Sequence, residues 1–70
     1  MAVLKINGAE KTFGQDQFPE TLAALLAHLN VDAATVVAEI EGRIIERANF
    51  ANTKLSTGQN IELVRFVPGG

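Results

Sequence analysis

The chain has 70 residues, of which 47% are hydrophobic and 20% are charged, and this length predicts one small domain, residues 1–70. Its net charge of −2 argues against nucleic acid as a partner, and the absence of cysteine excludes a disulfide framework or a catalytic thiolate. We expect a cytoplasmic protein with no membrane association, because no apolar run approaches the ~20 residues of a membrane span and no export signal opens the chain.

Alternating polarity at the start of the chain predicts a β-hairpin. The first strand, residues 3–7, places Leu4 and Ile6 on one face. Asn7–Gly8 supplies the positive φ angles that a tight turn needs, and residues 10–13 then return as the second strand.

Residues 19–29 change to the spacing of an amphipathic helix. Pro19 suits the first helical position, where its missing N–H would have no partner in any case. Asn30 can adopt the left-handed conformation that ends helices, and His28 is expected to be an exposed residue of the last turn. The apolar stripe of this helix consists of Leu22, Leu25, Leu26 and Leu29.

The second half of the chain predicts three more strands. Residues 36–40 are rich in β-branched side chains, residues 43–46 resume the extended pattern, and residues 61–67 form the most regular strand of the chain. The connections expected between them are a turn at 32–35, a break at 41–42, a single helical turn at 47–51 and a turn at 56–60.

This order of elements, ββαβββ, predicts an α+β fold in which one helix buries its leucines against a sheet. A hairpin, a helix laid across the sheet and a returning strand make the β-grasp, or ubiquitin-like, arrangement with a mixed sheet. In that arrangement the first and last strands run side by side. Leu4, Ile6 and Leu63 should then lie under the helix.

The search for a catalytic site finds little. His28 has no cysteine to join it in a zinc site, and Glu39 and Glu41 indicate a solvated sheet face better than a catalytic carboxylate pair. Isolated turn glycines replace the clustered glycines of a phosphate-binding loop: Gly8, Gly14, Gly42 and Gly58. We therefore predict that the chain is not an enzyme and binds no metal or cofactor itself.

The terminal Gly69–Gly70 pair is the remaining candidate. Because glycine lacks Cβ, this pair can thread a narrow channel and place the α-carboxylate of Gly70 beside a nucleotide in the site of another protein. Joining the carboxylate to AMP creates a mixed anhydride with a good leaving group. The Mg²⁺ and phosphate chemistry would then belong to the partner. The alternative is a frayed end without a function.

Taken together, these features resemble the ThiS family, the sulfur carrier proteins of thiamine biosynthesis within the MoaD/ThiS superfamily. The resemblance covers nearly the whole chain. Its strongest part is residues 39–51, with a strand, a glycine turn, a strand, an arginine and an aromatic residue in that order. Residues 57–59, residues 61–67 and Gly69–Gly70 continue it.

The resemblance implies that an E1-like adenylyltransferase of the ThiF type uses ATP and Mg²⁺ to form an acyl adenylate on Gly70. Sulfur from a persulfide donor would replace AMP, and the resulting thiocarboxylate would supply thiazole synthase of the ThiG type. The free carrier is expected to be a monomer. The resemblance also implies roles for the residues before Gly70. Phe66, Val67 and Pro68 would steer the tail, and Gly69 would be its slender support. Arg65 would contact the partners together with the exposed sheet face.

Other functions share parts of this pattern. Pro68 stands where the family more often has a small residue, and residues 66–70 partly resemble the small subunit of molybdopterin synthase. That family is usually longer and has adjacent prolines, so thiamine biosynthesis remains the first interpretation. A ubiquitin-like modifier, joined through Gly70 to a target lysine, is a second alternative. An interaction module with an idle tail is a third.

Overall fold

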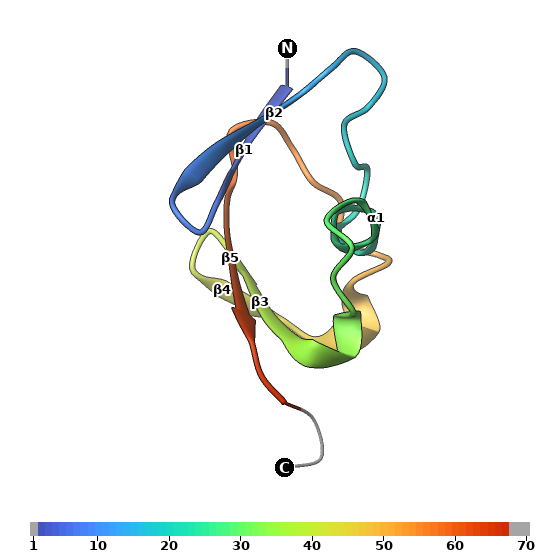
Figure 1. The fold of residues 1–70 in the computed structure, drawn as a ribbon, viewed down its shortest axis with the longest axis vertical. Helices are drawn as coiled ribbons and strands as arrows, with labels where there is room; N and C mark the ends of the chain where they lie inside the picture. Colours follow the sequence, from blue (N-terminus) through green and yellow to red (C-terminus); the bar gives the residue numbers. More distant parts are fainter. Residues whose placement is uncertain (1, 68–70) are drawn as a thin grey trace.

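The computed structural model describes residues 2–67 of the chain. These residues form a five-stranded sheet of order β2-β1-β5-β3-β4, with helix α1 lying across one of its faces (Figure 1). The elements are β1 (Ala2–Ile6), β2 (Ala9–Phe13), α1 (Leu22–His28), η1 (Ala33–Thr35), β3 (Val36–Ile40), β4 (Arg43–Ile45), η2 (Arg47–Asn49) and β5 (Asn60–Arg65), where η denotes a short 3-10 helix. No helix in this part of the chain is long and apolar enough to cross a membrane.

The predicted pairing of the first and last strands is confirmed. β1 and β5 are parallel neighbours at the centre of the sheet, with Ile6 opposite Ile61. The other strand pairs are antiparallel, so the sheet is mixed as expected. The hairpin between β1 and β2 turns at Asn7 and Gly8, whose φ angles are 50° and 83°.

The core lies between α1 and the sheet. Leu4 is fully buried, and Ile6 and Leu63 are half-buried against the same cluster, which confirms their predicted place under the helix. Burying one such aliphatic side chain contributes about 1.5–3 kcal/mol to stability. The largest completely buried side chains are Leu4, Leu22, Leu25, Leu26 and Ile61.

The prediction for the start of the helix is wrong. α1 begins at Leu22, and its N-cap is Thr21, whose hydroxyl accepts the N–H of Ala24 at 3.1 Å. Pro19 lies before the helix and is buried. The end of the helix is as predicted, because His28 is the last helical residue and is exposed, and Asn30 has a φ of 60°.

Contacts with the segment after η2 explain the later start. The N–H of Leu22 donates to the carbonyl of Thr53 at 2.9 Å, and the N–H of Leu55 donates to the carbonyl of Glu20 at 3.0 Å. Thr21 forms an isolated antiparallel bridge with Lys54. Residues 20 and 21 are thereby held in a strand-like pairing, so the helix begins only after them.

Two strands are shorter than predicted, and the connections agree with the prediction. β4 ends at Ile45, and β5 ends at Arg65 and not at Val67. The neighbouring strand β3 begins at Val36, opposite Arg65, and the residues before it form η1. Beyond Arg65 the two segments therefore share one more backbone hydrogen bond, from Phe66 to Thr35. η1 and η2 correspond to the predicted turns at 32–35 and 47–51.

Candidate functional site

β5 carries the chain to the predicted functional end. Its register with β3 places Arg65 opposite Val36, and the N–H of Phe66 then donates to the carbonyl of Thr35 at 2.8 Å. Figure 1 shows the strand leaving the sheet beyond this point. We call Arg65, Phe66 and Val67 the tail root. The remaining predicted site residues, Pro68, Gly69 and Gly70, lie outside the described residues.

Side-chain hydrogen bonds hold β5 in place where its backbone pairing with β1 is short. The β1–β5 ladder joins only Lys5 and Ile6 to their partners, and the Asn7 side chain extends it. Its Oδ1 accepts the N–H of Leu63 at 2.7 Å, and its Nδ2 donates to the carbonyl of the same residue at 3.2 Å. At the start of the strand, Glu41 Oε2 accepts the N–H of Asn60 at 2.6 Å. The path of β5 toward the tail root is thus fixed by side chains from the turns that follow β1 and β3, its two neighbouring strands.

The short helix η1 holds the carbonyl that anchors the tail root. Asp32 caps it, because its Oδ1 accepts the N–H of Ala34 at 2.9 Å. The Thr35 hydroxyl donates to the carbonyl of Asp32 at 2.7 Å, and the N–H of Thr35 donates to the same carbonyl at 3.0 Å. The side chains of Asp32 and Thr35 therefore stabilise this turn. That turn holds the Thr35 carbonyl in position to accept the N–H of Phe66.

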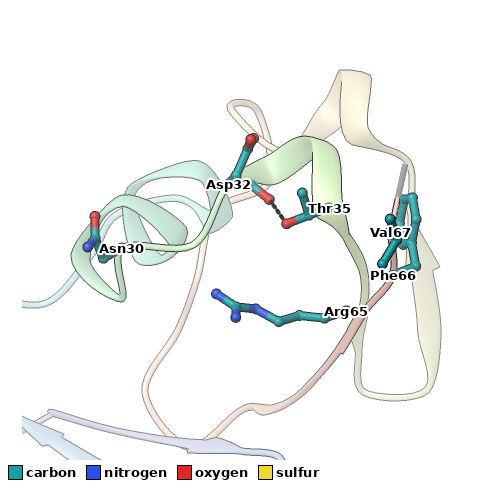
Figure 2. A pocket seen from close by; sticks show the side chains of 6 residues that line it. All are labelled: Asn30, Asp32, Thr35, Arg65, Phe66 and Val67. Atoms are coloured by element: carbon teal, nitrogen blue, oxygen red, sulfur yellow. Dashed lines mark hydrogen bonds between the residues drawn. The ribbon is translucent and has the colours of Figure 1, made fainter. Parts of the chain in front are cut away.

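A groove of about 490 Å³ opens beside the tail root, and we call it the root groove. Its lining residues are Asn30, Asp32, Thr35, Arg65, Phe66 and Val67. In Figure 2 the Arg65 side chain extends toward the Asn30 segment, whereas the Asp32 carboxylate points to the other side. Arg65 lies on the helix side of the sheet, because cross-strand partners share a face and its partner Val36 is buried.

The opposite face of the sheet carries a cluster of exposed apolar side chains. Val37 and Val64 are cross-strand partners, and Ile44 pairs with Glu39 on the same face. Phe66, the first residue after β5, lines one hollow together with Val37 and Ile44. We call Val37, Ile44, Val64 and Phe66 the outer patch, and their exposed fractions are 41%, 69%, 58% and 47%. A second hollow, of about 320 Å³, lies at its edge and includes Val37, Ile44 and Phe66 in its lining.

The structure separates two features that the sequence analysis placed together. Arg65 was expected to act with the exposed sheet face, but its side chain lies on the helix side, while the next residue, Phe66, belongs to the outer patch. Three members of the outer patch, Val37, Ile44 and Val64, were not predicted as site residues. Alternation along the sequence puts Val37 at the parity of Glu39 and Val64 at the parity of Glu62, but the register that brings Ile44 to the same face is not visible in the sequence.

The described residues offer surfaces for docking and no catalytic cluster. Within residues 2–67, no three His, Cys, Asp or Glu side chains come together as a metal site. His28 is exposed, and its ring lies 5.4 Å from that of Phe13. Glu39 and Glu62 are paired across the outer face, where neither is buried. What the arrangement provides is an anchored strand end with a charged groove on one side and an apolar patch on the other.

Two solved structures that match this fold are those of thiamine biosynthesis proteins. The crystal structure of the thiamine biosynthesis protein ThiS from Geobacter metallireducens matches with a TM-score of 0.80 and 31% identity, covering 97% of this chain and 99% of that one. A solution NMR structure of a thiamine biosynthesis protein from the same organism matches with a TM-score of 0.75 and 30% identity, covering 100% of this chain and 88% of that one. These matches confirm the β-grasp fold.

Sequence comparisons agree with the structural ones. A thiazole synthase from Paramagnetospirillum magneticum is 34% identical over 67 residues, which are 96% of this chain and 20% of that protein. The chain thus spans about a fifth of the length of this curated relative. The ThiS family matches residues 4–70. The chain therefore belongs to the ThiS family, whose members are non-enzymatic sulfur carrier proteins of thiamine biosynthesis.

Proposed function

We propose that the carboxylate of Gly70 is the group of this carrier that receives sulfur. The carboxylate attacks the α-phosphate of ATP, bound with Mg²⁺ on an E1-like adenylyltransferase, to give an acyl adenylate and pyrophosphate. A persulfide sulfur of the donor then attacks the acyl carbon, and AMP leaves. A thiol cleaves the S–S bond of the resulting acyl disulfide, which releases the thiocarboxylate and leaves the two partner sulfurs joined as a disulfide.

The observation that carries this proposal is the anchored tail root, which Pro68 separates from the two glycines in the sequence. Asn7 and Thr35 fix the strand as far as Phe66, so the body of the carrier can dock as a rigid unit. Gly69 is the fourth residue after Arg65, and Gly70 is the fifth. Neither glycine has a Cβ atom that would obstruct a narrow channel. A rigid body with a slender reactive end needs no catalytic side chain of its own.

Thiazole synthase is the acceptor that we propose for the sulfur. The relative named thiazole synthase contains a stretch that aligns with nearly all of this chain. A carrier-like segment inside a protein of that name supports a functional pairing between the two, since linking two modules raises their effective concentration for each other. After transfer the carrier would return with its carboxylate restored.

The outer patch is the surface that we propose for docking these partners. Within residues 2–67, the large apolar side chains that are exposed are the members of the outer patch and Val67. They lie beside the point from which the tail leaves, so a protein that binds them is placed to receive the tail. A modest, transient interface suits a carrier that must leave one enzyme to reach the next.

Intact-mass measurement tests the proposal. The protein is weighed as purified, which also establishes that Gly70 ends the chain, and again after incubation with ATP, Mg²⁺, the adenylyltransferase and a persulfide donor. We expect a gain equal to the exchange of one oxygen for sulfur, and a return to the first mass after thiazole synthase and its other substrates are added. A variant lacking Gly70 is the control and should not gain mass.

Two results would contradict the proposal. An equal gain in the variant without Gly70 would place the modification elsewhere. Amide-linked products of higher mass, with no thiocarboxylate, would show a protein modifier and not a sulfur carrier.

A further inference from the structure

Arg65 has features that the proposed function does not yet use. It is exposed, and it reaches into the root groove on the face opposite to the outer patch (Figure 2). Among the residues that line this groove it is the one with a positive charge. The acidic member, Asp32, already accepts the N–H of Ala34 and points away from the Arg65 guanidinium group. The groove therefore presents a cation that faces solvent.

The distance along the chain decides what this cation can meet. Five residues follow Arg65 up to Gly70, and a fully extended chain of that length spans at most about 18 Å. The pairing of Arg65 with Val36 keeps its backbone on the body of the carrier. Because its backbone is held there, we expect Arg65 to lie at the mouth of the channel when Gly70 reaches the nucleotide inside the partner. Its counterpart would then be a protein group at that rim.

We propose that the root groove receives a carboxylate-bearing segment at the channel mouth of the adenylyltransferase, and that Arg65 pairs with this carboxylate. The inference rests on the proposed function and adds the chemistry of one contact to it. A planar guanidinium group binds a carboxylate through two parallel hydrogen bonds, which gives direction as well as attraction. The groove leaves that guanidinium open to an approaching side chain.

The contact would orient the carrier on its partner. The outer patch supplies apolar contact on one face of the tail root, and an apolar contact alone tolerates rotation. A charge pair on the other face adds a second point, so that the tail enters the channel in one direction. Charges at the rim of an interface act mainly on the encounter rate and on its salt dependence. Arg65 should therefore affect KM for the carrier more than kcat.

The test measures adenylation, as pyrophosphate release, for wild type, Arg65→Gln, Arg65→Lys and Arg65→Glu over a range of carrier and salt concentrations. For Arg65→Glu we expect KM to rise about tenfold or more at low salt with kcat nearly unchanged, because like charges then face each other. Arg65→Gln should raise KM less than Arg65→Glu, and Arg65→Lys, which keeps the charge but lacks the paired donors of the guanidinium group, should give a KM between those of the wild type and Arg65→Gln. KM of the wild type should rise with salt, whereas that of Arg65→Gln should change little.

Arg43→Glu is the matched control. Arg43 is also exposed and faces the same side of the sheet, but it pairs with Ile40 at the end of β3 that is remote from the tail root. Arg43→Glu changes the net charge by the same amount as Arg65→Glu. If both variants raised KM equally above the wild-type value, the effect would be one of overall charge, and the inference would be overturned. Thermal unfolding of each variant confirms that it is folded.

The remaining outcomes distinguish failure of the Arg65 contact from failure of the proposed function at Gly70. If the wild type is adenylated on Gly70 but Arg65→Glu has an unchanged KM and salt dependence, the function stands and the contact is absent. If the wild type itself forms no adenylate with a competent enzyme, the proposed function fails, and the inference fails with it.

Discussion

At the scale of single residues, Asn7 has two structural roles that one residue type can combine. Its backbone has a φ of 50°, which asparagine tolerates better than most residues. Its side-chain amide bonds both the N–H and the carbonyl of Leu63, in the manner of a peptide group on a neighbouring strand. The Asn7–Gly8 turn could be predicted from the sequence. The bonds to Leu63 could not, because they join residues 56 positions apart.

Replacing Asn7 should therefore weaken the fold near the functional end. We expect Asn7→Gly to lower the free energy of unfolding by about 1–3 kcal/mol, because two backbone groups of Leu63 lose their partner while the positive φ is still permitted. Asn7→Asp keeps the acceptor for the N–H of Leu63 and should lose less. Urea denaturation measures both. An Asn7→Gly protein within a few tenths of a kcal/mol of wild type would contradict the assigned role.

At the scale of elements, the sequence patterns correctly predicted those features that depend on neighbouring residues. The hairpin, the apolar stripe of α1 and the body of β5 follow from side-chain periodicity and turn residues, and all three are present. The start of α1 was mispredicted because Pro19 was assigned to the first helical position, whereas the N-cap in the structure is Thr21. The backbone bonds that Thr53 and Leu55 make with Leu22 and Glu20 hold the chain before Leu22 in a strand-like pairing, and sequence periodicity does not reveal them.

This assignment predicts a measurable role for the Thr21 hydroxyl. Thr21→Ala should lower the free energy of unfolding by about 1 kcal/mol, because the N–H of Ala24 loses its capping oxygen. Thr21→Ser retains that oxygen and is the matched control, with a smaller loss expected. Thermal or urea unfolding distinguishes the two. Equal stability of Thr21→Ala and wild type would mean that the bond at Ala24 adds nothing.

At the scale of the whole molecule, the candidate site could be predicted only in part. The tail residues could be proposed as a site because they are adjacent in the sequence, and their role stays a prediction. The outer patch was missed because Val37, Ile44 and Val64 come from three strands, and strand order decides that they share one face. Arg65 follows Val64 along β5 and therefore lies on the other face. Sequence parity alone shows alternation along a strand and does not show which side is covered by a helix.

The outer patch can be tested as one surface that serves both partners in turn. Ile44→Ser should change stability little, because this side chain is 69% exposed, yet it should raise KM for adenylation about tenfold, which corresponds to about 1.4 kcal/mol of lost binding. The control is Ala27→Ser, which alters an exposed position of α1 beyond the opposite face of the sheet.

The second half of the test follows the sulfur. Carrier already bearing the thiocarboxylate is mixed with thiazole synthase, and we expect Ile44→Ser to slow sulfur transfer by a similar factor, while Ala27→Ser does not. Among residues 2–67 the exposed large apolar side chains lie beside or within the tail root, so we expect each enzyme that receives the tail to bind this patch and the partners to compete for it. An Ile44→Ser protein impaired in adenylation alone would assign the outer patch to the adenylyltransferase and require a different surface for thiazole synthase.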